Sequence, residues 1–142
     1  VLPLDLTKET KEKVNKSIEI AKLGSGAAIR VVSVLFTVDE FVVNRLTRQM
    51  AQVKMFIEKA NVECTAEIIK GIKGEETLAQ NIIDYANKVD GDLIMIMTQQ
   101  EVDFTERFIG SAAQEIMLNS DIPVLSIIPL HKKDTMEFVK PY

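Results

Sequence analysis

Residues 93–97 read Leu-Ile-Met-Ile-Met, an uninterrupted apolar run bounded by Asp92 and Thr98. Such a run predicts a β-strand that is buried on both faces, with its methionines as core residues and not as metal or cofactor ligands. Residues 27–36 are β-branched or aliphatic almost throughout and predict a second strand of the same kind. Strands covered on both faces are typical of a parallel sheet with helices on either side.

Three further strands and four helices are expected around these two strands. Residues 1–4 form a short apolar stub, residues 63–70 alternate, and residues 124–128 follow Pro123. Thr7 can cap the first helix, which Gly24 and Gly26 end, and the fourth helix runs from Ser111 to Asn119. The apolar seams of the second and third helices are expected at Val42, Leu46, Gln49 or Met50, Val53, Ile57 and Ala60, and then at Leu78, Ile82, Tyr85, Ala86 and Val89.

Strands therefore alternate with helices along the whole chain. This order predicts an α/β fold with a five-stranded parallel sheet and right-handed crossovers, doubly wound into a three-layer sandwich. No internal repeat and no second core is visible in the sequence. We expect one domain over residues 1–129 and a C-terminal tail over residues 130–142, which has no clear period.

The composition excludes several classes of function. The formal net charge of −4 argues against nucleic-acid binding, which depends on clustered Lys and Arg. No apolar run approaches the ~20 residues that span a membrane, so no membrane partner is expected. A single cysteine, Cys64, cannot form an internal disulfide, and this fits a reducing, cytoplasmic compartment. Nothing near Cys64 in the sequence would clearly lower the pKa of its thiol.

The candidate site follows from the expected fold. Ligands of open α/β sheets bind beyond the carboxyl ends of the strands, where the strand order reverses. If the first strand lies near the middle of the sheet, Asp5 and the segment from Thr98 leave the sheet at this point. The helix that begins at Ser111 turns its N-terminal N–H groups toward the same edge, which is a generic anion site.

The layout resembles the universal stress protein family over about residues 1–129. The resemblance rests on Pro3-Leu4-Asp5, on Ser33-Val34-Leu35, and on Asp92-Leu93-Ile94 followed by Gly110-Ser111-Ala112 and Ile122-Pro123-Val124. It implies the strand order 3-2-1-4-5 of adenine-nucleotide α-hydrolase-like folds. It also implies a dimer built through the fifth strand, and a nucleotide site whose residues in this chain would be Asp5, Val34, Gly110 and Ser111.

The phosphate-binding loop departs from the pattern of the members that bind ATP. Their signature is G-x2-G-x9-G followed by Ser or Thr, and when it is anchored on Gly110 the first two glycines fall at Met97 and Gln100. Glu101, Asp103 and Glu106 add negative charge where phosphates would bind, although Gln99 and Gln100 could donate hydrogen bonds through their amides. We therefore expect no cofactor, or ATP bound only weakly.

The retained site residues also have structural interpretations. Asp5 could hold adenosine or tie down the turn that follows its strand. Val34 would touch adenine through its backbone, yet it is a core residue in any version of the fold. Ser111-Ala112-Ala113-Gln114 is a capping box that needs no ligand.

The sequence gives little support to catalysis, because His131 lies past the last strand and Cys64 has no histidine partner. Two hypotheses remain: a non-enzymatic stress or regulatory module, and a nucleotide-binding module with a divergent loop and slow hydrolysis. In the first, residues Val124, Leu125, Ser126, Ile127 and Ile128 are an apolar edge strand that pairs with its own copy in a homodimer. Because the sequence begins with Val1, the pairing partner could instead be a sister domain of a tandem protein.

Overall fold

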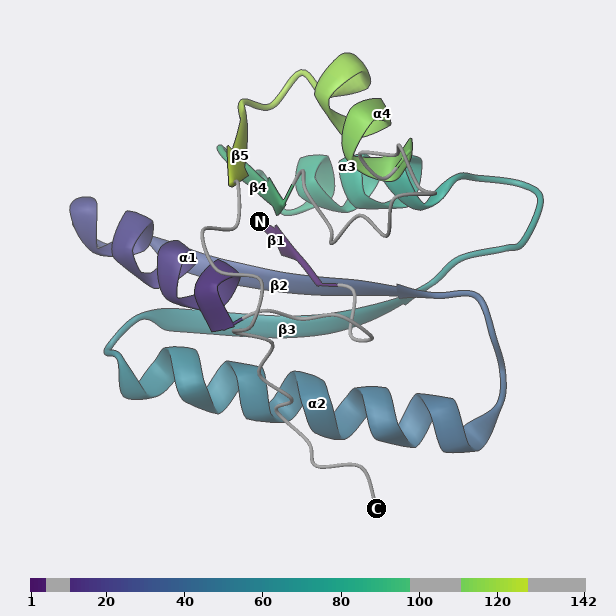
Figure 1. Ribbon diagram of the computed structural model, residues 1–142, viewed down its shortest axis with the longest axis horizontal. Coiled ribbons are helices and arrows are strands. Elements are labelled where there is room, and N and C mark those ends of the chain that lie inside the picture. The colour runs from purple at the N-terminus through teal and green to yellow at the C-terminus, as the bar shows by residue number, and fades with distance from the viewer. Residues whose placement is uncertain (5–10, 98–110, 128–142) are drawn as a thin grey trace, which may run out of the picture.

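The computed structural model describes residues 1–4, 11–97 and 111–127 (Figure 1). Strands and helices alternate along these residues, as the sequence predicts. The strands are β1 (Leu2–Pro3), β2 (Ala28–Leu35), β3 (Glu63–Lys70), β4 (Ile94–Met97) and β5 (Val124–Ile127). The helices are α1 (Lys11–Leu23), α2 (Glu40–Lys59), α3 (Leu78–Lys88) and α4 (Ser111–Asn119). Thr7, the expected cap of the first helix, and the residues from 128 onward lie outside the described part.

All observed strand pairs are parallel. β2 pairs with β1 on one side and with β3 on the other, while β4 pairs with β5. Two hydrogen bonds join these two groups, since the nitrogen of Val1 donates to the Leu93 carbonyl oxygen (2.6 Å) and the Met95 N–H donates to the Val1 carbonyl oxygen (3.0 Å). This pattern aligns Val1 with Ile94 as a parallel pair. The order is therefore β3-β2-β1-β4-β5, and the predicted fold class is confirmed.

The helices cover opposite faces of this sheet. One core cluster contains Val14 of α1 together with Val53 and Ile57 of α2, and a second cluster contains Ile82 of α3 together with Ile116 of α4. Strand β4 divides its side chains between them, with Met95 in the first cluster and Ile94 and Ile96 in the second. This division is the alternation expected of a strand buried on both faces.

Two seam residues were predicted wrongly. Val42 and Leu78, which were expected to face the core, are exposed, and the buried residues of α2 begin at Leu46. Helix α2 has 20 residues and is ~30 Å long, whereas the eight residues of β2 span ~26 Å. The first turn of α2 therefore extends beyond the sheet. Leu78 is likewise the first residue of α3, and it lies beyond the carboxyl ends of the strands.

A hydrogen bond between two helices fixes the start of α3 relative to α4. The Thr77 hydroxyl oxygen accepts a hydrogen bond from the Gln80 N–H (3.1 Å), which makes Thr77 the N-cap of α3. The same hydroxyl donates to Oε1 of Glu115 in α4 (2.7 Å). One side chain thus caps α3 and ties it to the helix whose N-terminus faces the candidate site.

We predict that Thr77→Ala lowers the free energy of unfolding by about 1–2 kcal/mol, because it removes the cap and leaves Glu115 without this donor. Thr77→Ser keeps the hydroxyl and should lose less than half as much. Thr47→Ala is the matched control, since the exposed Thr47 hydroxyl bonds only to the Val43 carbonyl within α2. Urea unfolding of the three variants decides the matter, and equal losses for Thr77→Ala and Thr47→Ala would contradict the role of Thr77.

Candidate functional site

The strand order reverses between β1 and β4. From β1 the chain continues through α1 to β2 on one side, whereas β4 lies on the other side of β1 and continues through α4 to β5. The carboxyl ends of β1 and β4 therefore adjoin, at a spacing of ~4.8 Å between neighbouring strands. The two helices that follow these strands leave toward opposite faces, and this is the geometry in which open α/β sheets hold ligands.

The predicted site residues are only partly described. Asp5 and Gly110 lie outside the described residues, and Ser111 begins α4 but its side chain is not described. Val34, near the end of β2, is half-buried and packs against the core cluster beneath α3 and α4. Its side chain is therefore occupied by packing, which leaves its backbone as the part that a ligand could contact. The nucleotide site as a set of four residues remains a prediction.

The end of β2 and the first turn of α4 lie over the same part of the core. Val34, Ala112 and Ala113 all pack against the cluster that contains Ile96 and Ile116. In a parallel crossover the helix runs antiparallel to the strands, so the first N–H groups of α4 lie at the carboxyl edge of the sheet. The first turn of α4 contains no acidic side chain that would offset the helix dipole there.

Met97 ends β4 at this edge and is partly buried. It is aligned with Ile127 of β5 and packs against the cluster beneath α1 and α2. Met97 stands where the nucleotide signature has its first glycine. A side chain that packs on the core therefore occupies a position at which glycine would leave the backbone accessible to a ligand. The neighbouring residues Gln100, Glu101 and Asp103 lie outside the described residues.

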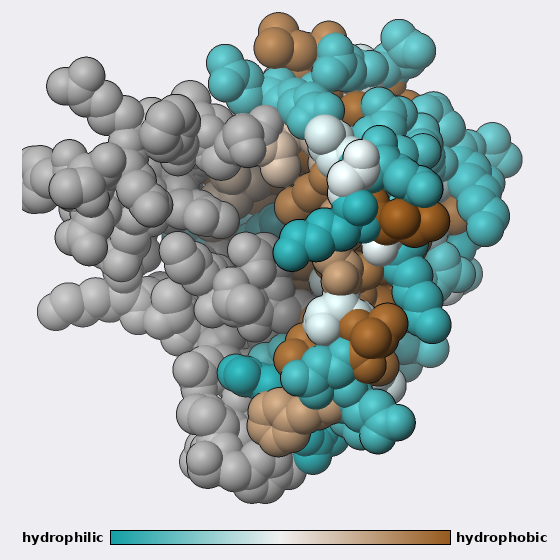
Figure 2. Space-filling model, turned by 90° about the vertical axis from the view of Figure 1, so that its right-hand side faces the viewer, coloured by the Kyte–Doolittle hydropathy of each residue, from teal (hydrophilic) through white to brown (hydrophobic). Residues whose placement is uncertain are grey.

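Exposed apolar side chains form a rim at the same edge of the sheet, which the sequence analysis did not predict. The rim consists of Phe36, Val38 and Phe41 from the connection between β2 and α2, with Ile72 and Leu78 from the connection between β3 and α3. Figure 2 faces this end of the molecule and shows brown side chains between teal ones. The ring of Phe36 lies across Gly71, where an added Cβ would come within 2.3 Å of Cε1. The sequence signal that could have revealed part of this rim is the apolar composition of residues 36–42.

The described residues contain no candidate metal centre. Within residues 1–4, 11–97 and 111–127 no group of three His, Cys, Asp or Glu side chains could hold a metal ion. Burial, and then the nearby Glu58 carboxylate, raise the pKa of the Cys64 thiol to about 11, so it stays protonated and unreactive at neutral pH. His131 lies outside the described part. No helix in that part is both long and apolar enough to cross a membrane.

Known proteins share this fold. The universal stress protein from Archaeoglobus fulgidus superimposes with a TM-score of 0.72 at 21% identity, over 88% of this chain and 94% of that chain. A universal stress protein from Archaeoglobus fulgidus in complex with dAMP gives a TM-score of 0.65 at 23% identity, over 88% of this chain and 93% of that chain. A universal stress protein in complex with cAMP gives 0.65 at 15% identity, over 89% and 93%. Among proteins with curated sequences, none matches this chain.

At these identities the solved structures establish the fold alone. The family itself is established by sequence, since the profile of the universal stress protein family matches residues 1–127 of the 142. The match includes every strand and helix that the structure describes. This chain belongs to the universal stress protein family.

Proposed function

We propose that this chain is a stress-response or regulatory module that works by dimerising and by contacting other proteins, and that it catalyses no reaction. The observation that carries the proposal is Met97. Its side chain packs on the hydrophobic core at the position where the nucleotide-binding signature needs a glycine. A backbone that carries this side chain cannot wrap phosphates as a glycine does. ATP is therefore bound weakly or not at all.

The charges of the loop after Met97 act in the same direction. Glu101, Asp103 and Glu106 bring three negative charges against one nearby positive charge, that of Arg107. Two like charges about 6 Å apart repel by roughly 3 kcal/mol at an effective dielectric near 20. Each hydrogen bond lost to a charged phosphate costs a further ~1.5–3 kcal/mol. Together these effects correspond to a loss of affinity of at least about a hundredfold.

A second candidate function is the binding of an adenine nucleotide through a divergent loop, with slow hydrolysis. Two of the similar solved structures carry dAMP and cAMP. In this chain the N-terminus of α4 opens at the carboxyl edge of the sheet, and the sequence keeps Asp5, Gly110 and Ser111. These features support a residual anion site, which is weaker than a complete phosphate loop.

The proposed dimer uses the edge formed by β5. Within the described residues β5 pairs only with β4, while Val124 and Leu125 are half-buried and Ser126 is exposed. Helix α4, which leads into β5, also exposes Met117 and Leu118. Antiparallel pairing of two β5 strands would cover this apolar edge and satisfy its backbone groups. A sister domain of a longer protein would cover it in the same way. The single cysteine fits the cytoplasmic setting that we propose for either form.

We predict that Mg-ATP binds with a dissociation constant of about 100 μM or weaker, because the phosphate cradle is incomplete. Isothermal titration of the chain measures this constant, and a low-micromolar value would overturn the proposal. Glu101→Gln with Asp103→Asn should strengthen binding severalfold, and adding Met97→Gly with Gln100→Gly should strengthen it further. Glu63→Gln with Asp90→Asn is the control. It makes the same change in net charge at the amino ends of the strands, away from the candidate site at their carboxyl ends.

We predict that the chain is a dimer at tens of micromolar and that Ser126→Pro shifts it toward monomer. The Ile94 N–H donates to the Pro123 carbonyl oxygen (2.9 Å), so alternation turns the N–H of Ser126 away from β4. Proline at 126 thus removes a donor of the dimer and leaves the pairing with β4. Sedimentation velocity reports the mass. A wild-type chain that is only monomeric would refute self-pairing, and it would leave pairing with a sister domain.

A further inference from the structure

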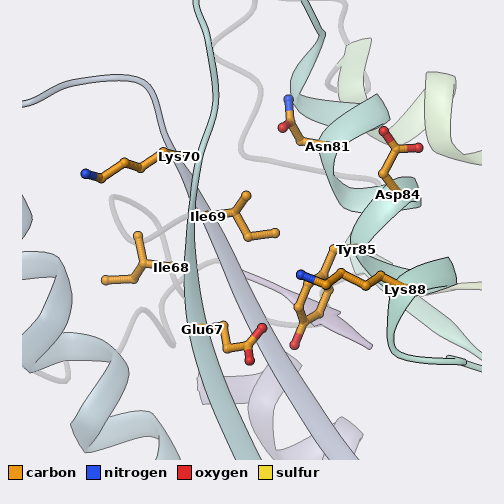
Figure 3. A pocket seen from close by; sticks show the side chains of 8 residues that line it. All are labelled: Glu67, Ile68, Ile69, Lys70, Asn81, Asp84, Tyr85 and Lys88. Atoms are coloured by element: carbon orange, nitrogen blue, oxygen red, sulfur yellow. The ribbon is translucent and has the colours of Figure 1, made fainter.

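Two features of the described surface are used neither by the candidate nucleotide site nor by the proposed β5 dimer. One is a groove of about 490 Å³ between β3 and α3 (Figure 3). Its charged lining residues are two acids and two bases, Glu67, Asp84, Lys70 and Lys88, and the Lys70 side chain points away from Lys88. The charge of this groove therefore selects no occupant. The other feature is the apolar rim at the carboxyl edge of the sheet.

The rim is formed by two neighbouring connections of the sheet. Val38 is 88% exposed, Phe41 68% and Ile72 60%, although each is a large apolar side chain. Phe36 joins the two connections, because its ring lies against Gly71, the residue before Ile72. Single apolar side chains are common on protein surfaces, whereas a group of neighbouring ones marks a surface that another segment or molecule covers.

The charge around the rim is negative. Residues 36–42 and 71–78 hold four exposed acidic residues and one exposed basic residue, which are Asp39, Glu40, Glu75, Glu76 and Lys73. Lys70, at the end of β3, leaves the sum negative. A surface of this charge is repelled by the anionic lipids of a membrane, and it favours an apolar segment that carries positive charge.

The size of the rim favours a short segment over a second copy of the chain. Five apolar side chains, three of them more than half exposed, make a patch of the size found on ordinary monomers, ~300–600 Å². A stable dimer buries about 800 Å² on each partner. The rim alone is therefore too small to hold a second copy.

The chain beyond β5 starts at the same edge of the sheet as the rim. Because all the strands are parallel, β5 ends at Ile127 on the side where β2 and β3 end. In the order β3-β2-β1-β4-β5, β2 lies three strand spacings from β5, or ~14 Å. Residues 128–142 can extend over ~50 Å. This segment is thus long enough to reach the rim.

The composition of residues 128–142 matches the rim. Residues 136–142 contain four large apolar side chains, which are Met136, Phe138, Val139 and Tyr142. The whole segment has three lysines against two acidic residues, so the sign of its charge is opposite to that of the rim. Both the apolar surface and the charge therefore have a complement within the same chain.

We propose that residues 136–142 pack on the apolar rim and cover it. Their apolar side chains contact Val38, Phe41 and Ile72, and the lysines of the segment lie near the surrounding carboxylates. Because the segment is joined to β5, its effective concentration at the rim is high, and fewer contacts suffice than for a separate partner. The contact requires neither a bound nucleotide nor the β5 dimer.

The test places a nitroxide spin label at Lys140→Cys in the ¹⁵N-labelled full chain. Cys64 is buried and the pKa of its thiol is about 11, so the label reacts at residue 140. We expect the label to weaken the amide signals of residues 36–42 and 71–78 at least about twofold relative to those of residues 24–27 and 60–62, at the amino ends of the strands. No such loss is expected when unlabelled ¹⁵N chain is mixed with spin-labelled chain that carries no ¹⁵N.

Val38→Ser with Phe41→Ser should abolish the signal loss at residues 71–78, because it removes the apolar contact at two exposed positions. Phe138→Ser with Val139→Ser should do the same and changes no described residue. The control is Leu23→Ser with Met55→Ser, at side chains that are 84% and 56% exposed outside the rim, and it should retain the loss.

Three outcomes overturn the proposal. One is a signal loss spread evenly over the surface, and another is a loss at the rim that persists in both serine pairs. The third is a loss in the mixed sample, which would make a second copy the occupant of the rim. None of these outcomes bears on ATP affinity or on pairing through β5, so the proposed function is judged separately.

Discussion

The pairing of β1 with two neighbours is the constraint on which the rest of the structure depends. β1 is only two residues long, yet it pairs with β2 along its whole length. The next residue but one after Leu2 extends this pairing, because the Leu4 N–H donates to the Val32 carbonyl oxygen (2.9 Å). On its other side Val1 bonds to Leu93 and Met95. Without these bonds the sheet would be two separate parts, β2-β3 and β4-β5. With them, Leu2 is almost completely buried and the carboxyl ends of β1 and β4 meet.

The edge that β1 and β4 create has the geometry at which open α/β sheets bind ligands, but this chain uses part of it for packing. Val34 and Met97 both lie at the edge, and both direct their side chains into the core clusters. The Thr77 hydroxyl holds α3 to α4 just behind the helix N-terminus that would face an anion. The adjoining ends of β1 and β4 and the dipole of α4 are therefore retained, whereas the Met97 side chain packs in the core.

The fold could be predicted because its signals are local. Runs such as residues 27–36 and 93–97 are apolar enough to require burial on both faces, and the glycines and caps between them mark the turns. The strand order is not a local property, and it came from the resemblance to a family. Val42 and Leu78 were misplaced because helical periodicity does not reveal how far a helix extends beyond its sheet.

The site was harder to predict than the fold. The nucleotide-binding signature of the family pointed to Met97 when it was aligned on Gly110, and the structure adds that this side chain is packed. The bond between Thr77 and Glu115 joins residues that are 38 positions apart, so no local pattern announces it. The groove between β3 and α3 likewise arises from a strand edge and a helix face that only the three-dimensional arrangement brings together. Asp5 and Gly110 lie outside the described residues and remain predictions.

Native-state hydrogen exchange tests most directly the claim that β1 makes the two parts of the sheet one structure. The informative amides are those of Leu4, Met95 and Ile94, which donate to Val32, Val1 and Pro123 in turn. If β1 joins the sheet, all three should exchange through the same opening, with free energies that agree within about 1 kcal/mol. Exchange of Ile94 and Met95 through a much smaller opening that leaves Leu4 protected would show that the two parts unfold separately, and it would contradict the account.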